Sequence, residues 1–334
     1  MAGASARKRT LRSSNPLPPV PYTKPYLAVP DQLALIRSRG MAISDLPKAT
    51  EMLNRIGYYR LGGYWYPFRA STTGATGAVV GDSFRPGSDL GTIIDLYIFD
   101  KKLRLLMMDA FERIEIALRV QIALTLGRRG AWAHRDPQAL HGNFARRTDP
   151  KAKKVLHQQW LQKTDDQFNA SKEEFAKHFR RRYSDDNPPI WIACEAWDFG
   201  AMSHLYSGMQ IVDRDEIAAE YRLTGDVLAS WIRNINVARN VCAHHSRLWN
   251  KPIPAQPVWP ARVSDLGHLS GNIAAQTRAY GTAALTRYLL RQTSPATSWG
   301  ARFKGLIFSF PTSPMISLAS AGFPAGWEAQ PLWA

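Results

Sequence analysis

The feature that most constrains the fold is a long stretch from Leu90 to Leu126 that contains no proline. Its apolar residues recur at intervals close to those of one face of an α-helix; they are Ile94, Tyr97, Leu105, Met108, Ile114, Leu118 and Ile122. Glu115 and Arg119 form a favourable pair four residues apart. The stretch predicts one long helix, or two in sequence, in an all-α helical bundle.

Shorter helices are expected on both sides of this stretch. Leu33, Leu35 and Ile36 precede the helix stop at Arg39-Gly40, and Ser44-Asp45 is a typical helix start. Three more helices are expected, one from Pro189 onward, one from about Val227, capped by Asp226, to before Lys251, and one from about Asn272 to Gln292.

The chain is predicted to divide into five segments. They are a disordered, basic, Pro-rich arm (1–24), an N-terminal helical region with an aromatic block (25–70), a loop (71–90), a helical domain with a basic insertion at about 125–182 (91–310), and a Pro- and Trp-rich strap packed over the bundle (311–334). With 334 residues, 45% of them hydrophobic, the chain can bury a full core.

Cysteine is too scarce for a disulfide framework or a four-thiolate zinc site, because only Cys194 and Cys242 occur. There is also no long apolar leader and no run of about 18 uncharged apolar residues. We therefore expect a protein of the reducing cytoplasm that does not act at a membrane.

The helix expected from Val227 carries a polar stripe. Its members are spaced by three or four residues and so share one face; they are Arg233, Asn236, Asn240, His244 and Arg247. The opposite face is apolar and suited to burial. Arg239 lies about 140° around an ideal helix from His244, so the two converge only through the length of the arginine, a distortion, or a second copy of the helix.

These residue types suit metal-independent RNA cleavage, because the ribose 2′-hydroxyl next to each phosphate is a nucleophile already in place. A histidine such as His244 can carry the proton, and Arg239 can hold the phosphate and stabilise its charge. Asn240 can orient the imidazole or bind the phosphate; Arg247 and Asn236 support it. His245 points away from the stripe and is expected to pack or to support the site from behind.

Positive charge favours a polyanionic partner. The net charge is +16 and the pI is about 10.0. Half of this excess lies in residues 125–182, where fourteen Lys and Arg face six Asp and Glu. We interpret this insertion as the main RNA-facing segment, with backbone contacts from Lys151, Lys153, Lys154, Arg180, Arg181 and Arg182. The competing interpretation is a solvated helical face without a ligand, and the arm at 1–24 is open to the same two interpretations.

An aromatic block at residues 58–68 mixes Tyr, Trp and Phe with nearby arginines. Such a mixture can stack bases and neutralise phosphates. Large rings gathered in this way more often pack in a core, and we favour packing, with Arg60 and Arg69 exposed and able to contact RNA.

Competing chemistries lack support in the sequence. There is no phosphate-binding glycine loop, no His-Glu-x-x-His and no Cys-x-x-Cys, and no cofactor is expected. Cys242 and His244 would diverge on a helix, which disfavours a metal site, and a cysteine nucleophile assisted by His245 is disfavoured because Cys242 lies on the apolar face. A non-catalytic RNA-binding or RNA-regulated effector stays open as the alternative to a ribonuclease.

Five ordered blocks resemble one family. Residues 239–250 resemble the R-N-x-x-A-H-H-x-R-L-W-N signature of the Abi-like (AbiD/AbiF-type) abortive-infection proteins of bacteriophage resistance, and Arg239 to His244 matches the R-x4-6-H motif of the HEPN superfamily. The other blocks are at 58–68, with Gly62 where serine is usual, at 99–119, at 199–205 and at 322–333.

The resemblance implies a HEPN-like helical domain, an endoribonuclease active without a metal, a composite site in a homodimer, and a role in halting phage-infected cells. It also implies RNA as substrate, a small RNA as a further regulatory partner, and an RNA or protein inhibitor encoded nearby.

Overall fold

The computed structural model describes residues 21–74 and 77–334. The arm predicted at 1–24 lies almost entirely outside the described residues. Helices make up most of the described chain, and the all-α prediction is confirmed, with one two-stranded hairpin among the described residues.

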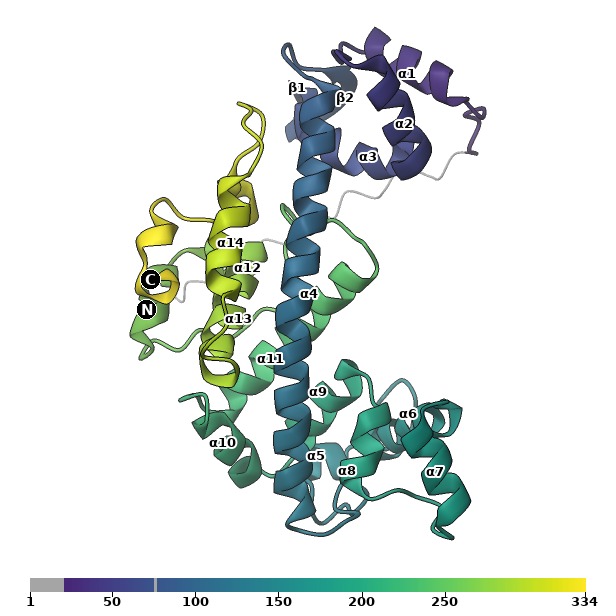
Figure 1. Cartoon of the computed structure of the whole chain (residues 1–334), viewed down its shortest axis with the longest axis vertical. Helices are drawn as coiled ribbons and strands as arrows, with labels where there is room; N and C mark the ends of the chain where they lie inside the picture. Colours follow the sequence, from purple (N-terminus) through teal and green to yellow (C-terminus); the bar gives the residue numbers. More distant parts are fainter. Residues whose placement is uncertain (1–20, 75–76) are drawn as a thin grey trace, which may run out of the picture.

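Helix α4 (Leu90–Gly127) is the axis of the molecule; of the two predicted alternatives, one long helix or two in sequence, the structure has one helix. Asp89 caps it by accepting a hydrogen bond from the Thr92 N–H at 2.9 Å. Elements from both halves of the sequence pack along α4, as Figure 1 shows. Of the apolar residues expected to face the core, Leu105 is instead exposed.

Three short helices lie at one end of α4: α1 (Val29–Ser38), α2 (Leu46–Ile56) and α3 (Tyr58–Trp65) (Figure 1). Asp45 caps α2 as predicted, since its carboxylate accepts a hydrogen bond from the Lys48 N–H at 2.9 Å. Helix α3 packs directly on α4. The first half of the aromatic block therefore lies against the central helix.

The prediction of a loop at 71–90 is wrong for most of these residues, because β1 (Arg69–Gly74) and β2 (Gly77–Phe84) form an antiparallel hairpin. Ser71 pairs with Val80 and Thr72 with Val79, and β-branched residues favour extended backbone. The abundance of Ser, Thr and Gly concealed this preference. Phe84 ends the hairpin and packs edge-on against Trp65.

The basic insertion lies at the opposite end of α4, as Figure 1 shows. It contains α5 (Gly142–Ala145), α6 (Leu156–Ala170) and α7 (Glu174–Arg182), and α8 (Ile190–Ala193) follows it. Trp160 on α6 packs edge-on against Trp197, with ring centroids 5.0 Å apart, and so ties the insertion to the main core. Its surface is charged, but its inner face is an ordinary aromatic core.

The remaining helices cover the rest of α4: α9 (Phe199–Gly208), α10 (Ile211–Ala219), α11 (Gly225–Ala243), α12 (Ile273–Thr277), α13 (Ala279–Thr293) and α14 (Trp299–Phe308). The single helix expected from Asn272 to Gln292 is interrupted at Arg278, whose backbone is extended. The helix expected from Pro189 is likewise divided, into α8 and α9.

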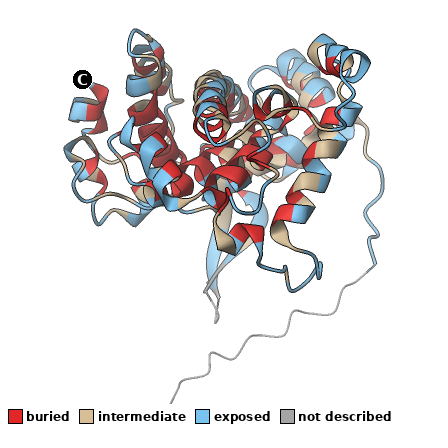
Figure 2. Ribbon diagram, turned by 90° about the horizontal axis from the view of Figure 1, so that it is seen from below, coloured by how far each residue is buried: buried red, intermediate tan, exposed pale blue. Residues whose placement is uncertain are grey.

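The C-terminal segment packs over the bundle through its aromatic residues. Trp333 stacks on Phe303 of α14 with ring centroids 4.8 Å apart, and its indole N–H donates to the Tyr280 hydroxyl. One hydrophobic core runs from Leu33 to Trp333, and Figure 2 shows the buried residues gathered where the helices face one another. In the described part of the chain no helix combines the length and the apolar character that crossing a membrane requires.

Candidate functional site

Helix α11 carries the predicted polar stripe and packs against α4, α9, α10 and α13. Its apolar face is buried as expected; it includes Trp231, Ile235, Ala238 and Cys242. The predicted cap at Asp226 is wrong, because Thr224 accepts the hydrogen bond from Val227 N–H while Asp226 pairs with Arg214. Burial of the apolar face fixes which side of α11 reaches solvent.

The helix ends at Ala243, several residues earlier than predicted. His244 is the C-cap, and His245 adopts a left-handed conformation with φ 56°. The Ser246 N–H bonds to the Val241 carbonyl at 2.9 Å and the His245 N–H to the Cys242 carbonyl at 3.0 Å, which is the Schellman arrangement that closes a helix. The polar stripe therefore stops at His244, and Arg247 does not belong to it.

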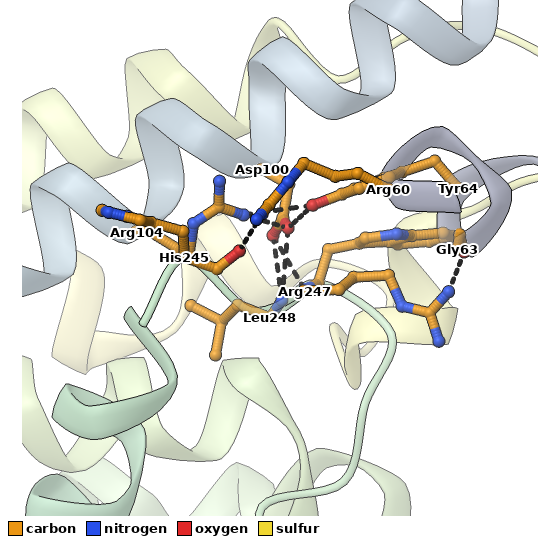
Figure 3. A network of polar contacts seen from close by, with 9 residues as sticks. Arg60, Gly63, Tyr64, Asp100, Arg104, His245, Arg247 and Leu248 are labelled. Atoms are coloured by element: carbon orange, nitrogen blue, oxygen red, sulfur yellow. Dashed lines mark hydrogen bonds and ion pairs between the residues drawn. The ribbon is translucent and has the colours of Figure 1, made fainter. Parts of the chain in front are cut away.

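The loop after α11 is held by Asp100 of α4, which is completely buried (Figure 3). Its carboxylate accepts hydrogen bonds from the Tyr64 hydroxyl at 2.7 Å, from Arg104 Nη1 at 2.6 Å, and from the backbone N–H groups of Leu248 and Trp249. Burial raises the pKa of Asp100, while Arg104, Tyr64 and the two N–H groups act in the opposite direction. This network turns the chain away from the helix axis.

Helix α3 fixes the same loop from the other side (Figure 3). Arg60 Nη1 donates to the His245 carbonyl at 2.8 Å, and Arg247 donates to the Gly63 carbonyl. Arg247, predicted to support catalysis, thus joins the loop to α3 and lies away from the stripe. His245, expected to pack, is exposed, and its backbone carbonyl makes the contact with α3.

The three predicted catalytic residues lie at the last turns of α11. Asn240 and His244 are exposed and Arg239 is half-buried. Arg239 Nη1 donates to Asn240 Oδ1 at 3.3 Å. No hydrogen bond among the described residues joins Arg239 to His244, in keeping with their separation around the helix. The structure brings Arg239 and Asn240 together and leaves His244 facing solvent at the helix end.

Arg239 lines a cleft of about 400 Å³ between α11 and α4. The α4 side is formed by Met108, Asp109, Glu112, Glu115, Ile116 and Arg119. Arg119 pairs with Glu115 at 3.0 Å, as the sequence predicted. Burial raises the pKa of Glu115, whereas the charges of Arg119 and Arg239 lower it. The cleft therefore places two guanidinium groups next to acidic side chains.

Sequence reasoning missed the acidic side of this cleft. Glu112 and Glu115 belong to a block that resembles the family, but from the sequence we assigned Glu115 only a pairing with Arg119 within the helix. A signal for the acidic side exists: Glu112, Glu115 and Arg119 share one side of α4, which is therefore as polar as the exposed face of α11.

Asn236, the other predicted supporting residue, is half-buried beside the start of α9. A Cβ atom at Gly200 would lie 3.7 Å from Asn236 Nδ2, an ordinary contact distance, so Asn236 lies next to the first turn of α9. Asn236 is thus placed between two helices, one turn before Asn240. Arg233 lies one turn earlier and is exposed.

The two cysteines are buried. Burial raises the pKa of Cys242, and that of Cys194, to about 12, which opposes formation of a thiolate nucleophile. Within residues 21–74 and 77–334, no three or more His, Cys, Asp or Glu side chains are grouped so that they could hold a metal ion.

The cations predicted to bind RNA differ in their availability. Lys151, Lys153 and Lys154 are exposed in the turn before α6, and Lys153 has φ 52°. Arg180 instead donates to the backbone carbonyls of Phe168 and Ser171 and lies over the Phe168 ring, so its role is structural. Arg181 lies 3.8 Å from Glu174, and Arg182 is exposed.

Two arginines were expected to be exposed beside the aromatic block, and of these Arg60 is exposed. Arg69 is half-buried and pairs with Asp82 at 3.4 Å. The preference for packing holds for Leu61, Tyr64, Trp65 and Phe68, which are buried, but Tyr59 and Tyr66 are exposed.

The comparisons with known proteins point to one family. The model of the Abi-like protein family matches residues 51–250, which include α3, α4 and α11 and the network around Asp100. No curated protein and no solved structure matches the chain significantly.

Proposed function

Because this chain belongs to the Abi-like family, the family of abortive infection and phage defence, we propose that it is an endoribonuclease of such a system. The observation that carries the proposal is the geometry of α11. Its packing and the Asp100 network hold the C-terminal end of the helix, where Asn240 lies beside Arg239 and His244, the C-cap, reaches solvent. A rigid element that presents these donors is suited to a phosphodiester.

In the proposed reaction the ribose 2′-hydroxyl attacks the adjacent phosphorus, and the 5′-oxygen leaves. A 2′,3′-cyclic phosphate and a 5′-hydroxyl result. His244 carries the proton at one of these oxygens, and Arg239 stabilises the charge on the phosphate. Asn240, which accepts a hydrogen bond from Arg239, orients the guanidinium. No metal ion is required, because the nucleophile belongs to the substrate.

We propose that the site is completed by a second copy of the chain. Arg239 faces the α4 cleft while His244 lies at the helix end, so one copy does not bring them together. Helix α4 exposes four apolar side chains that a second copy would cover, Leu105, Ile116, Val120 and Leu124, and Ile116 also lines the cleft. A two-fold axis near this face would pair Arg239 of one copy with His244 of the other.

For the remaining RNA contacts we propose the exposed cations of the insertion, Lys151, Lys153, Lys154 and Arg182. These side chains can bind backbone phosphates without regard to sequence. Arg180 is excluded from this set because its guanidinium is already engaged.

The test is cleavage of RNA in EDTA by the wild type, by His244→Ala and by His245→Ala. His245 is the matched control, because it is an adjacent exposed histidine. We expect His244→Ala to lose at least 100-fold in rate and His245→Ala to retain most of it. Equal activity of wild type and His244→Ala would refute the catalytic role. RNA binding without cleavage by any of the three proteins would favour the non-catalytic effector.

A further inference from the structure

A cavity of about 890 Å³ lies away from the motif helix, between the segment 21–28, α1, α3 and the hairpin. Its walls are mainly aromatic; the rings are Tyr22, Tyr26, Tyr58, Tyr59, Trp65 and Tyr66. Its cations are Lys24, Arg39 and Arg69, and Asp82 is its one acid. None of these residues lines the cleft at Arg239, although Arg69 and the aromatic block were considered as RNA contacts from the sequence.

Several of the rings are available to a ligand. Tyr59 is 78% exposed and Tyr66 is 54% exposed, whereas Trp65 is buried behind them. Tyr58 packs edge-on against both Trp65 and Tyr59, with centroids 4.9 and 5.7 Å away. Rings held in this way present fixed flat faces, on which planar groups can stack.

The polar groups of the cavity favour an anionic ligand. Arg39 and Arg69 share the Asp82 carboxylate, at 3.0 and 3.4 Å, so one acid faces two guanidinium groups. Lys24 adds a third positive charge at the rim. With three cations and one acid, the residues that line the cavity therefore carry a net charge of +2.

Two buried donors of the cavity wall lack partners. Neither Trp65 Nε1 nor Arg69 Nε has a hydrogen-bond acceptor among the residues that the structure describes. Both atoms are enclosed by the protein, so they mark a wall whose polar groups are not all satisfied. The parts of the wall that a ligand can reach are the cations and the flat aromatic faces.

We propose that this cavity binds unpaired bases and the adjoining phosphates of an RNA strand. A base supplies the flat face for Tyr59 and Tyr66, and its phosphate supplies the negative charge. Paired bases are stacked within a duplex and do not enter such a cavity. The inference rests on the proposed function and deepens it, because it names single-stranded RNA as the form of substrate.

Helix α3 connects this cavity with the motif loop. Tyr58, Tyr59 and Trp65 lie on the face toward the cavity, while Arg60 and Gly63, on the other face, bind the loop after His244. RNA held in the cavity therefore rests on the same short helix that fixes the end of α11.

The test uses the full chain with His244→Ala, so that cleavage does not interfere with binding. Binding of a labelled oligouridine is followed by fluorescence anisotropy, and its contacts are mapped by 4-thiouridine crosslinking and mass spectrometry. Adding Tyr59→Ala and Tyr66→Ala together should weaken binding about 5- to 100-fold. The variant Phe308→Ala, another exposed ring outside the cavity, should bind like the parent.

Crosslinks within residues 58–69 and a weaker preference for single-stranded over duplex RNA in the double variant would support the proposal. Parent-like binding by a double variant with an unchanged thermal melting curve would overturn it. Displacement of the RNA by AMP at equal base concentration would also overturn it, because it would indicate a site for free nucleotides. Binding of a proline-rich peptide in place of RNA would overturn it as well. If the crosslinks fall here but the wild type cleaves nothing, only the catalytic proposal fails.

Discussion

Asp100 on α4 and Trp249 in the loop after α11 are joined by a hydrogen bond of 2.9 Å from the Trp249 N–H to the buried carboxylate. The two residues are 149 positions apart in the chain. This contact, with those of Tyr64, Arg104 and Leu248, holds the loop that follows the motif helix. His244 therefore lies directly before a loop that is anchored by a carboxylate outside the candidate site.

We expect Asp100→Asn to destabilise the fold by about 3–5 kcal/mol, because Arg104 would keep a buried charge without its partner. Thermal and urea unfolding measure this effect. Glu51→Gln is the control, since Glu51 pairs with Arg55 at the surface, and it should cost about 0.5 kcal/mol or less. A similar loss in both variants would contradict the role of Asp100.

Arg239→Ala should lower kcat for RNA cleavage by about 100- to 1,000-fold, because the charge developing on the phosphate loses its donor. Arg239→Lys should recover part of this loss, since an ammonium keeps the charge but not the paired geometry. Single-turnover kinetics give the rates, and exposed Arg233→Ala on the same helix is the control. A loss confined to KM would show that Arg239 acts in binding alone.

Leu124→Glu should produce a monomer that no longer cleaves RNA, because it places a charge on the exposed apolar face of α4. Light scattering reports the mass and the RNA assay the activity. Val212→Glu makes the same change at an exposed position of α10 and should alter neither. An active Leu124→Glu monomer would exclude the composite site.

Replacing Lys151, Lys153 and Lys154 together with glutamine should weaken RNA binding and lower the slope of log affinity against log salt by about two to three. A titration of salt against anisotropy measures this slope. Replacing Lys101, Lys102 and Lys48, which lie outside the insertion, provides a variant of equal charge. An unchanged slope in the insertion variant would show that these three lysines do not contact RNA.

The stability should fall below pH 6.5 because of His134. Burial lowers the pKa of His134 to about 3, and burial also lowers the pKa of His157, whose ring bonds to the His134 carbonyl. Between about pH 3 and 6.5 the unfolded chain binds more protons than the fold, so acid favours unfolding. Going from pH 7.5 to 5 should cost about 2 kcal/mol from His134. His134→Gln should reduce this slope in urea titrations, and exposed His178→Gln should leave it unchanged.

Local patterns were enough to predict part of the fold. The periodicity of α4 and the cap at Asp45 depend on neighbouring residues, and both are confirmed. The early end of α11 was not predicted, because the loop that follows it is held by Asp100, which lies far away in the sequence. The hairpin was missed because the Gly and Ser residues around it favour loops and mask the strand preference of Thr72, Thr73, Val79 and Val80.

For the candidate site, the sequence predicted Arg239, Asn240 and His244 but not their surroundings. The partners of Arg247 and Arg60 and the acidic side of the cleft depend on how α3, α4 and α11 meet. The aromatic cavity likewise depends on how separate segments meet in the fold. Its walls come from four separate segments, and the two unpaired donors appear only once the chain is folded.

Helix α4 has 38 residues, so as a straight α-helix it is about 57 Å long. The aromatic cavity lies near one end and the lysines of the insertion near the other, as Figure 1 indicates for the elements that carry them. A continuous helix fixes this separation. An RNA that occupies both surfaces must span the length of α4. Affinity should therefore increase with oligonucleotide length and then level off once the strand reaches from one end of α4 to the other.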